Sequence, residues 1–160
     1  MSSDFYYNAG SIPSLHCVLK KWGTAIRRYQ ECYGKNDCPW WYNERATLSS
    51  LAGAVWLASG NALEEYSTEK GRKMNSYKGR CDIAISIGYE LFICEAKQAL
   101  FSIGHKAKNG LDKVKSNLDQ ACKAAENLST EDGRRLGICF AVPHLPQQDT
   151  KFIEEQCEKL

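Results

Sequence analysis

An aspartate and a glutamate, Asp82 and Glu95, lie in two short apolar segments that are typical of neighbouring β-strands. The segments are residues 80–87 (RCDIAISI) and 90–97 (ELFICEAK), and the two residues between them, the first a glycine, suit a tight hairpin turn. A two-residue turn sets Asp82 directly opposite Glu95, on the sheet face that also carries Lys97. The alternate positions form a mostly apolar stripe on the other face, as a correct register requires.

The chemistry that this hairpin face could support is metal-assisted hydrolysis of a phosphodiester. Two like charges across a ladder destabilise a sheet unless a cation cancels their repulsion. Mg²⁺ takes oxygen ligands, often one or two carboxylates together with substrate phosphate and water. The ammonium of Lys97 could then hold, or help to deprotonate, a water aimed at phosphorus. A salt-bridge cluster on a solvated sheet face would use the same residues with no catalytic role.

Basic residues are gathered in segments, although the net charge is only +2. Residues 70–80 hold five basic side chains and no acid, and residues 97–123 hold six lysines against two aspartates. Lys and Arg neutralise a nucleic-acid backbone without reading its sequence, so such segments could form a surface for a polyanion. The candidate phosphate contacts are Arg72, Lys73, Lys78, Arg80, Lys106 and Lys108.

The elements that must position this hairpin alternate between helical and strand patterns. Helices are predicted over 11–33, 43–58, 109–128 and 149–160, the second of them capped by Asn43. Strands are predicted over 62–68, 80–87, 90–97 and 136–142, with a basic loop over 69–79 and with Pro143 closing the last strand. This order, without repeat or linker, predicts a single α/β domain of residues 1–160.

Length and composition are those of an ordinary globular protein. The 160 residues are 43% hydrophobic and 25% charged, which excludes a disordered or fibrous chain. No apolar run approaches the roughly 20 residues of a membrane span, and the first ten residues lack a secretory pattern, so we expect a cytoplasmic protein with no membrane partner. The eight cysteines lack a C-x-x-C pair and are expected to be buried free thiols. A zinc site of Cys32, Cys38 and a histidine is the alternative.

The hairpin and its surroundings resemble the PD-(D/E)xK, or restriction-endonuclease-like, nuclease superfamily. Asp82 is followed after twelve residues by Glu95 and, two positions on, by Lys97, which is the spacing of the superfamily's acids and lysine. Residues 43–142 follow the α-β-β-β-α-β order of its core, which surrounds a mixed sheet. The helix over 11–33 and the last helix would be additions to that core.

The resemblance implies a role for each matching position. Asp82 and Glu95 would bind Mg²⁺ or Mn²⁺, and the backbone carbonyl of Ala96 would add a third oxygen ligand. Lys97 would position the attacking water or steady the charge of the transition state. The proline that usually precedes the first acid is Cys81 here.

Two further positions enter through the same resemblance. Glu44 matches the acid that many members place in the first core helix, where it would be a further metal ligand, and Glu64 or Glu65 on the first strand competes for that role. Gln98, directly after the lysine, would help to orient the substrate.

The resemblance thus implies a metal-dependent endonuclease that hydrolyses DNA, with RNA as the less favoured substrate. A catalytically inactive nucleic-acid-binding module of the same fold, and a zinc-stabilised interaction domain, are the alternatives. The apolar last helix could dock on this domain, pair with a second copy in a homodimer, or continue into further domains of a longer parent chain.

Overall fold

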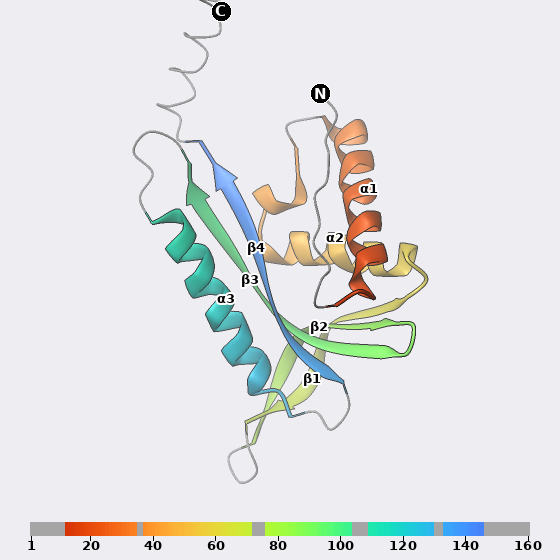
Figure 1. Cartoon of the computed structure of the whole chain (residues 1–160), viewed down its shortest axis with the longest axis vertical. Coiled ribbons are helices and arrows are strands. Elements are labelled where there is room, and N and C mark those ends of the chain that lie inside the picture. Colours follow the sequence, from red (N-terminus) through yellow and green to blue (C-terminus); the bar gives the residue numbers. More distant parts are fainter. Residues whose placement is uncertain (1–11, 35–36, 72–75, 104–108, 130–132, 146–160) are drawn as a thin grey trace, which may run out of the picture.

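In the computed structural model, helices cover both faces of a four-stranded mixed sheet (Figure 1). The structure describes residues 12–34, 37–71, 76–103, 109–129 and 133–145. The helices are α1 (Leu15–Tyr33), the short 3₁₀ helix η1 (Pro39–Trp41), α2 (Glu44–Leu57) and α3 (Gly110–Glu126). The strands are β1 (Asn61–Lys70), β2 (Tyr77–Ile87), β3 (Glu90–Ser102) and β4 (Arg134–His144). The predicted α/β class is confirmed.

The strands follow one another across the sheet in the order β1-β2-β3-β4. The first three pair antiparallel, whereas β4 runs parallel to β3. Parallel neighbours need a crossover, and α3 provides it on one face of the sheet. The opposite face is covered by α2, on which α1 packs (Figure 1). None of the helices in the described ranges combines the length and the hydropathy that crossing a bilayer requires.

The start and the end of α2 have clear local causes. The side chain of Asn43 accepts a hydrogen bond from the backbone N–H of Ala46 at 2.8 Å, which confirms the predicted cap. At the other end the chain turns directly into β1 through Gly60. A side chain at Gly60 would lie 2.5 Å from the backbone oxygen of Ser86, so only glycine allows this approach.

Apolar side chains form a core on each face of the sheet. The larger cluster joins α1 and α2 to the sheet and includes Val18, Leu51, Val55, Ile85 and Phe92. The smaller cluster lies under α3 and consists of Cys81, Ile93, Ala125 and Leu128, with Tyr66 and Ala84 packed against it.

The strands are longer than the apolar pattern predicts. The ladder between β1 and β2 continues to the pair Lys70–Tyr77, so five of the seven described residues of the predicted loop over 69–79 are strand. Backbone pairing in a hairpin outweighs the polar composition of these residues. Pro143 does not close β4, because β4 is an edge strand and an edge position tolerates a missing N–H donor. The predicted last helix, 149–160, lies outside the described residues.

Candidate active site

At Asp82 and Glu95, the two predicted metal ligands, the sheet divides into the pairs β1–β2 and β3–β4, and we call this point the fork. The two-residue turn sets the expected register between β2 and β3 over five pairs, but the ladder ends at Ile83–Cys94. Asp82 and Glu95 would be the next pair, so their expected direct pairing is wrong. Instead, Oδ2 of Asp82 accepts a hydrogen bond from the backbone N–H of Ala96 at 2.7 Å. From this point β2 stays with β1, and β3 stays with β4.

A distortion in β1 changes which side chains face α2. Glu65 has a φ of +52°, in the left-handed region, and its pair with Asp82 is missing from the β1–β2 ladder. As a result two consecutive side chains, Glu64 and Glu65, both reach α2. Glu64 accepts a hydrogen bond from Ser49 at 2.8 Å, and Glu65 pairs with Arg45 at 3.0 Å.

The same distortion changes the faces along β2. Regular alternation predicts that Cys81 shares the face of Ile83, with Asp82 on the other. In the structure Cys81 belongs to the cluster under α3, whereas Ile83 belongs to the cluster under α1 and α2. Asp82 lies on the α2 side, so the predicted division of faces is wrong at this end of the strand.

Three carboxylates from three elements line one hollow of about 370 Å³. They are Glu44 at the start of α2, Glu65 on β1 and Asp82 on β2. The sequence does not predict this grouping. Two of the three acids, Glu65 and Asp82, face α2 only because the backbone is distorted at Glu65.

Lys97 and Glu44 meet beside this hollow. The Nζ atom of Lys97 lies 3.9 Å from Oε1 of Glu44 and donates a hydrogen bond to the carbonyl of Ala96 at 2.7 Å. The other carboxylate oxygen of Glu44 accepts a hydrogen bond from the backbone N–H of Gln98 at 2.6 Å. Of the three competing glutamates, Glu44 is therefore the one that contacts the lysine.

The side chain of Gln98 anchors α2 and η1 to β3. Its oxygen accepts a hydrogen bond from the hydroxyl of Thr47 at 2.8 Å, and its nitrogen donates to the carbonyl of Trp40 at 2.9 Å. Its amide is thus engaged inside the protein, in a position that holds the start of α2 against the strand that carries Lys97.

Glu95 is buried and forms an ion pair that the sequence does not predict. Its carboxylate lies 2.7 Å from Nζ of Lys70, and the two side chains are 5% and 17% exposed. Burial raises the pKa of Glu95, as does the charge of Asp82 to a lesser degree, whereas the ion pair with Lys70 lowers it. A side chain at Gly79 would lie 2.8 Å from Cδ of Lys70, so this glycine makes room for the lysine stem.

The basic residues predicted to contact phosphate are only partly described. Lys78 lies on β2 rather than in the predicted loop, Arg80 lies on β2 as predicted, and both are exposed. Arg80 lies 3.5 Å from Glu65, which also pairs with Arg45. The other candidates, Arg72, Lys73, Lys106 and Lys108, lie outside the described residues.

The side chains at the fork offer the type of donor atom that a hard cation prefers. The acids at the fork offer only carboxylate oxygens, which Mg²⁺ and Mn²⁺ prefer, and Oδ1 of Asp82 accepts no hydrogen bond from the described part of the chain. Within the same ranges, however, no three His, Cys, Asp or Glu side chains already form a metal-binding group. The cysteines of the alternative zinc site are not part of such a group among the described side chains either. Cys32 is exposed, and Cys38 is buried beside Gln30.

Comparisons with protein-family models, with curated proteins and with solved structures find no match to the chain.

Proposed function

We propose that this chain is a divalent-cation-dependent nuclease of the PD-(D/E)xK type, with a restriction-endonuclease-like arrangement of its sheet, and that it hydrolyses DNA. One observation carries the proposal. Glu44 and Asp82 line one hollow from different elements, and both are tied to the strand segment from Ala96 to Gln98 by contacts of 2.6–3.9 Å. An acidic pair with an adjacent ammonium is the side-chain set that metal-assisted phosphodiester hydrolysis needs.

Asp82 and Glu44, which line the hollow, would hold Mg²⁺ or Mn²⁺, and Glu95, which is buried against Lys70 and is not among the residues that line the hollow, would be the further oxygen ligand. A bound ion would supply Lewis-acid stabilisation of the charge that develops on the phosphate. The carbonyl of Ala96 accepts from Lys97, and a carbonyl oxygen has a second lone pair for a further contact. Lys70 holds the carboxylate of Glu95 in place inside the fork.

Lys97 is the residue that would act on the water or on the phosphate. Its side chain is 35% exposed, so the ammonium can reach a substrate in the hollow while Ala96 and Glu44 restrain it. From there it can donate to a phosphate oxygen or to the attacking water. The contact between Glu44 and the N–H of Gln98 fixes the distance between α2 and β3, and so the place of this ammonium.

Cationic side chains beside the hollow support a nucleic-acid substrate. Arg45 and Arg80 are 68% and 70% exposed and flank the carboxylate of Glu65 from two elements. Exposed guanidinium groups contact phosphates without sequence preference and would hold a strand across the fork.

Cleavage of a supercoiled plasmid in Mg²⁺ or Mn²⁺ tests the proposal. Lys97→Met and Asp82→Asn should each slow cleavage about 10²–10⁴-fold, the usual contribution of a positioned acid–base group. Lys123→Met removes an equal charge from an exposed position on α3 and should leave the rate unchanged. Anisotropy of labelled DNA and RNA duplexes would show whether binding survives in each variant.

The outcomes separate the proposal from its alternative. Loss of cleavage with retained DNA binding in the Lys97 variant supports a nuclease. Wild-type protein that binds DNA but cuts it with neither metal would support an inactive binding module. Cleavage that persists in the Asp82 variant would come from another protein or another site and would reject the proposal.

A further inference from the structure

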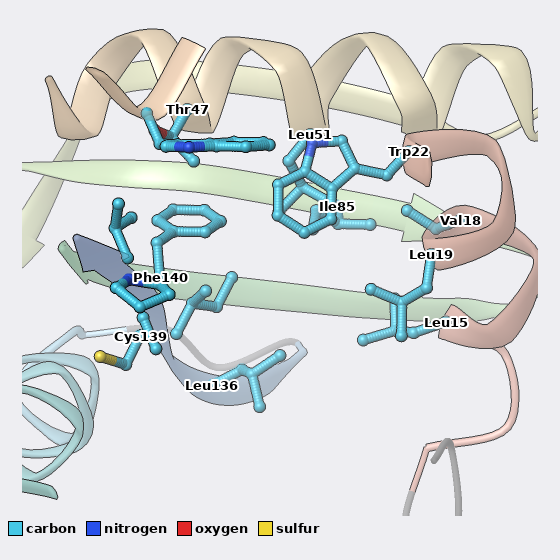
Figure 2. Close-up of a pocket in the computed structure, with 15 residues that line it drawn as sticks. Leu15, Val18, Leu19, Trp22, Thr47, Leu51, Ile85, Leu136, Cys139 and Phe140 are labelled. Atoms are coloured by element: carbon cyan, nitrogen blue, oxygen red, sulfur yellow. The ribbon is translucent and has the colours of Figure 1, made fainter. Parts of the chain in front are cut away.

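Three consecutive aromatic residues lead into α2, and they differ in exposure. Trp40 lines an apolar cavity of about 660 Å³, whose walls include Trp22 and Phe140 (Figure 2). The next two residues, Trp41 and Tyr42, are 50% and 63% exposed. Packing inside the protein therefore accounts for Trp40 but not for the two residues after it, and we call Trp41 and Tyr42 the aromatic platform.

Hydrogen bonds restrain the ring of Tyr42. Its hydroxyl donates to Oδ2 of Asp37 at 3.0 Å, and the hydroxyl of Tyr29 on α1 donates to the same oxygen at 3.1 Å. The Tyr42 side chain is thus fixed at its tip although most of the residue is exposed. Tyrosine and tryptophan side chains that are ordered before binding lose little conformational entropy on contact, which makes them effective anchors for a ligand.

The backbone next to the platform is tied to the strand of the candidate active site. The carbonyl of Trp40 accepts a hydrogen bond from the side chain of Gln98 at 2.9 Å. The backbone N–H of Gln98 donates to Glu44 at 2.6 Å, and Gln98 directly follows Lys97 on β3. These contacts fix the platform relative to the ammonium of Lys97.

The platform lies beside the hollow. Tyr42 is followed directly by Asn43 and Glu44, which both line it. Consecutive Cα atoms are about 3.8 Å apart, so the Cα atoms of Trp41 and Tyr42 are at most about 11 and 8 Å from that of Glu44. When a phosphate of a strand enters the hollow, the bases next to it are therefore within reach of these rings.

Paired and unpaired bases differ in what they offer to an exposed ring. In a duplex the bases stack on one another, so a protein reaches only the base edges and the phosphates. An unpaired base offers its whole face, and its contact with an aromatic side chain strengthens binding about 5- to 150-fold whichever base it is. An exposed pair of aromatic rings therefore suits a single strand better than a duplex.

We propose that Trp41 and Tyr42 stack on unpaired bases, and that the preferred substrate is a single-stranded stretch of DNA and not a continuous duplex. This inference rests on the proposed function, because the hollow is taken as the place of the phosphate that is cleaved. The platform then selects the substrate, while the acids and Lys97 act on the phosphate.

Anisotropy of a labelled oligo(dT) and of a duplex of equal length tests the proposal, in Mg²⁺ and with the Lys97→Met chain so that neither DNA is cut. Oligo(dT) should bind more tightly than the duplex. Trp41→Ala and Tyr42→Ala, each added to this chain, should weaken the binding of oligo(dT) about 5- to 150-fold. Both should weaken the binding of the duplex less than about twofold.

Two further variants separate stacking from a structural effect. Tyr42→Phe keeps the ring but loses the hydrogen bond to Asp37, and it should retain most of the affinity for oligo(dT). Trp56→Ala is the matched control, because Trp56 is 58% exposed but lies about 18 Å along α2 from Glu44. It should change neither affinity.

The outcomes distinguish this inference from the proposed function. If the wild-type chain cuts DNA in a Lys97-dependent way but Trp41→Ala and Tyr42→Ala leave the binding of oligo(dT) unchanged, the platform is rejected and the nuclease stands. If both variants lose that binding in a chain that cuts no DNA, the stacking site stands and the nuclease is rejected. An equal loss in Trp56→Ala would overturn the platform. So would a dimer that Trp41→Ala dissociates, because a second copy would then cover these rings.

Discussion

At the scale of single residues, Glu95 shows how the fork keeps a charge inside the protein. A buried carboxylate is costly unless it is paired, and Lys70 provides the partner from the end of β1. The lysine reaches it by crossing Gly79, which has no side chain to block the way. The ion pair is therefore a buried structural contact of the fork and differs from an ion pair on the solvated surface.

Replacing this partner should cost more stability at neutral than at acidic pH. Lys70→Met leaves Glu95 buried without a counter-ion, which should lower the free energy of unfolding by about 3–5 kcal/mol near pH 7. Burial raises the pKa of Glu95, and loss of Lys70 removes the stronger of the two lysines that lower it. As the pH falls through that raised pKa, Glu95 becomes neutral and the loss should shrink. Urea denaturation at several pH values measures this.

Lys78→Met is the matched control, since Lys78 is an exposed lysine on the neighbouring strand. It should change stability by no more than about 0.5 kcal/mol at any pH. An equal loss in both variants, or a Lys70→Met loss that does not depend on pH, would show that the pair with Glu95 is not what stabilises the fork.

At the scale of elements, the start of α2 connects stability to the site. Asn43 caps the helix through Ala46, and the next residue, Glu44, contacts both β3 and Lys97. A helix that frays here would release a carboxylate from the hollow. The cap is therefore expected to affect the site as well as the helix.

Asn43→Ala should destabilise the protein by about 0.5–2 kcal/mol, the usual cost of losing an N-cap. Chemical denaturation gives this value directly. Asp119→Ala, in the middle of α3 and exposed, is the control and should be neutral or slightly stabilising because alanine favours helix. If both variants behaved alike, the Asn43 cap would contribute nothing beyond helix propensity.

Two glycines in different elements should respond in opposite ways to alanine. A side chain at Gly137 on β4 would lie 2.5 Å from the backbone nitrogen of Cys122, where α3 crosses the strand. Gly137→Ala must push α3 away, at a cost of about 1–3 kcal/mol or more. Gly53, inside α2, has no atom within 4 Å of such a side chain. Gly53→Ala should stabilise by about 0.5–1 kcal/mol. Thermal denaturation of the two variants checks both signs.

At the scale of the whole molecule, two apolar cores separated by the sheet decide which cysteines are accessible. All seven described cysteines are free thiols. The expectation that they are buried is confirmed for Cys38, Cys81 and Cys94 but is wrong for others. The exposed ones are Cys17, Cys32 and Cys122.

Alkylation by iodoacetamide should follow this division. Burial raises the pKa of the thiols of Cys38, Cys81 and Cys94, which lowers their thiolate fraction, and it also blocks the reagent. Peptide mapping should show rapid labelling of the three exposed cysteines in the folded protein and labelling of the buried three only in denaturant. Labelling of Cys94 at the rate of Cys17 would mean that the centre of the sheet is open.

Much of the fold could be predicted because its signals are local. The Asn43 cap, the two-residue hairpin turn and the helical spacing of α1 and α3 each depend on residues within a few positions of one another. The register between β2 and β3 followed from the turn alone. Element lengths were predicted less well, since pairing across β1 and β2 extends strands through polar sequence.

The residues of the candidate site were recognisable in the sequence, but their arrangement was not. The spacing singles out Asp82, Glu95 and Lys97, because a two-residue hairpin turn fixes which residues of the two strands share a face. It cannot show that Glu65 takes a left-handed conformation, which turns two consecutive acids toward α2. Nor can it show that Lys70 reaches Glu95, a residue 25 positions away.

The amino-acid sequence alone predicts the type and order of the described elements, the hairpin register as far as Ile83–Cys94 and the residues of the candidate site. The tertiary structure alone decided where the sheet forks, which acids share the hollow and which cation neutralises Glu95. The reason is physical: periodicity and turn chemistry act between neighbours along the chain. Contacts across the fork depend on sheet twist, a strained residue and space left by a glycine, and these arise only when distant segments pack together.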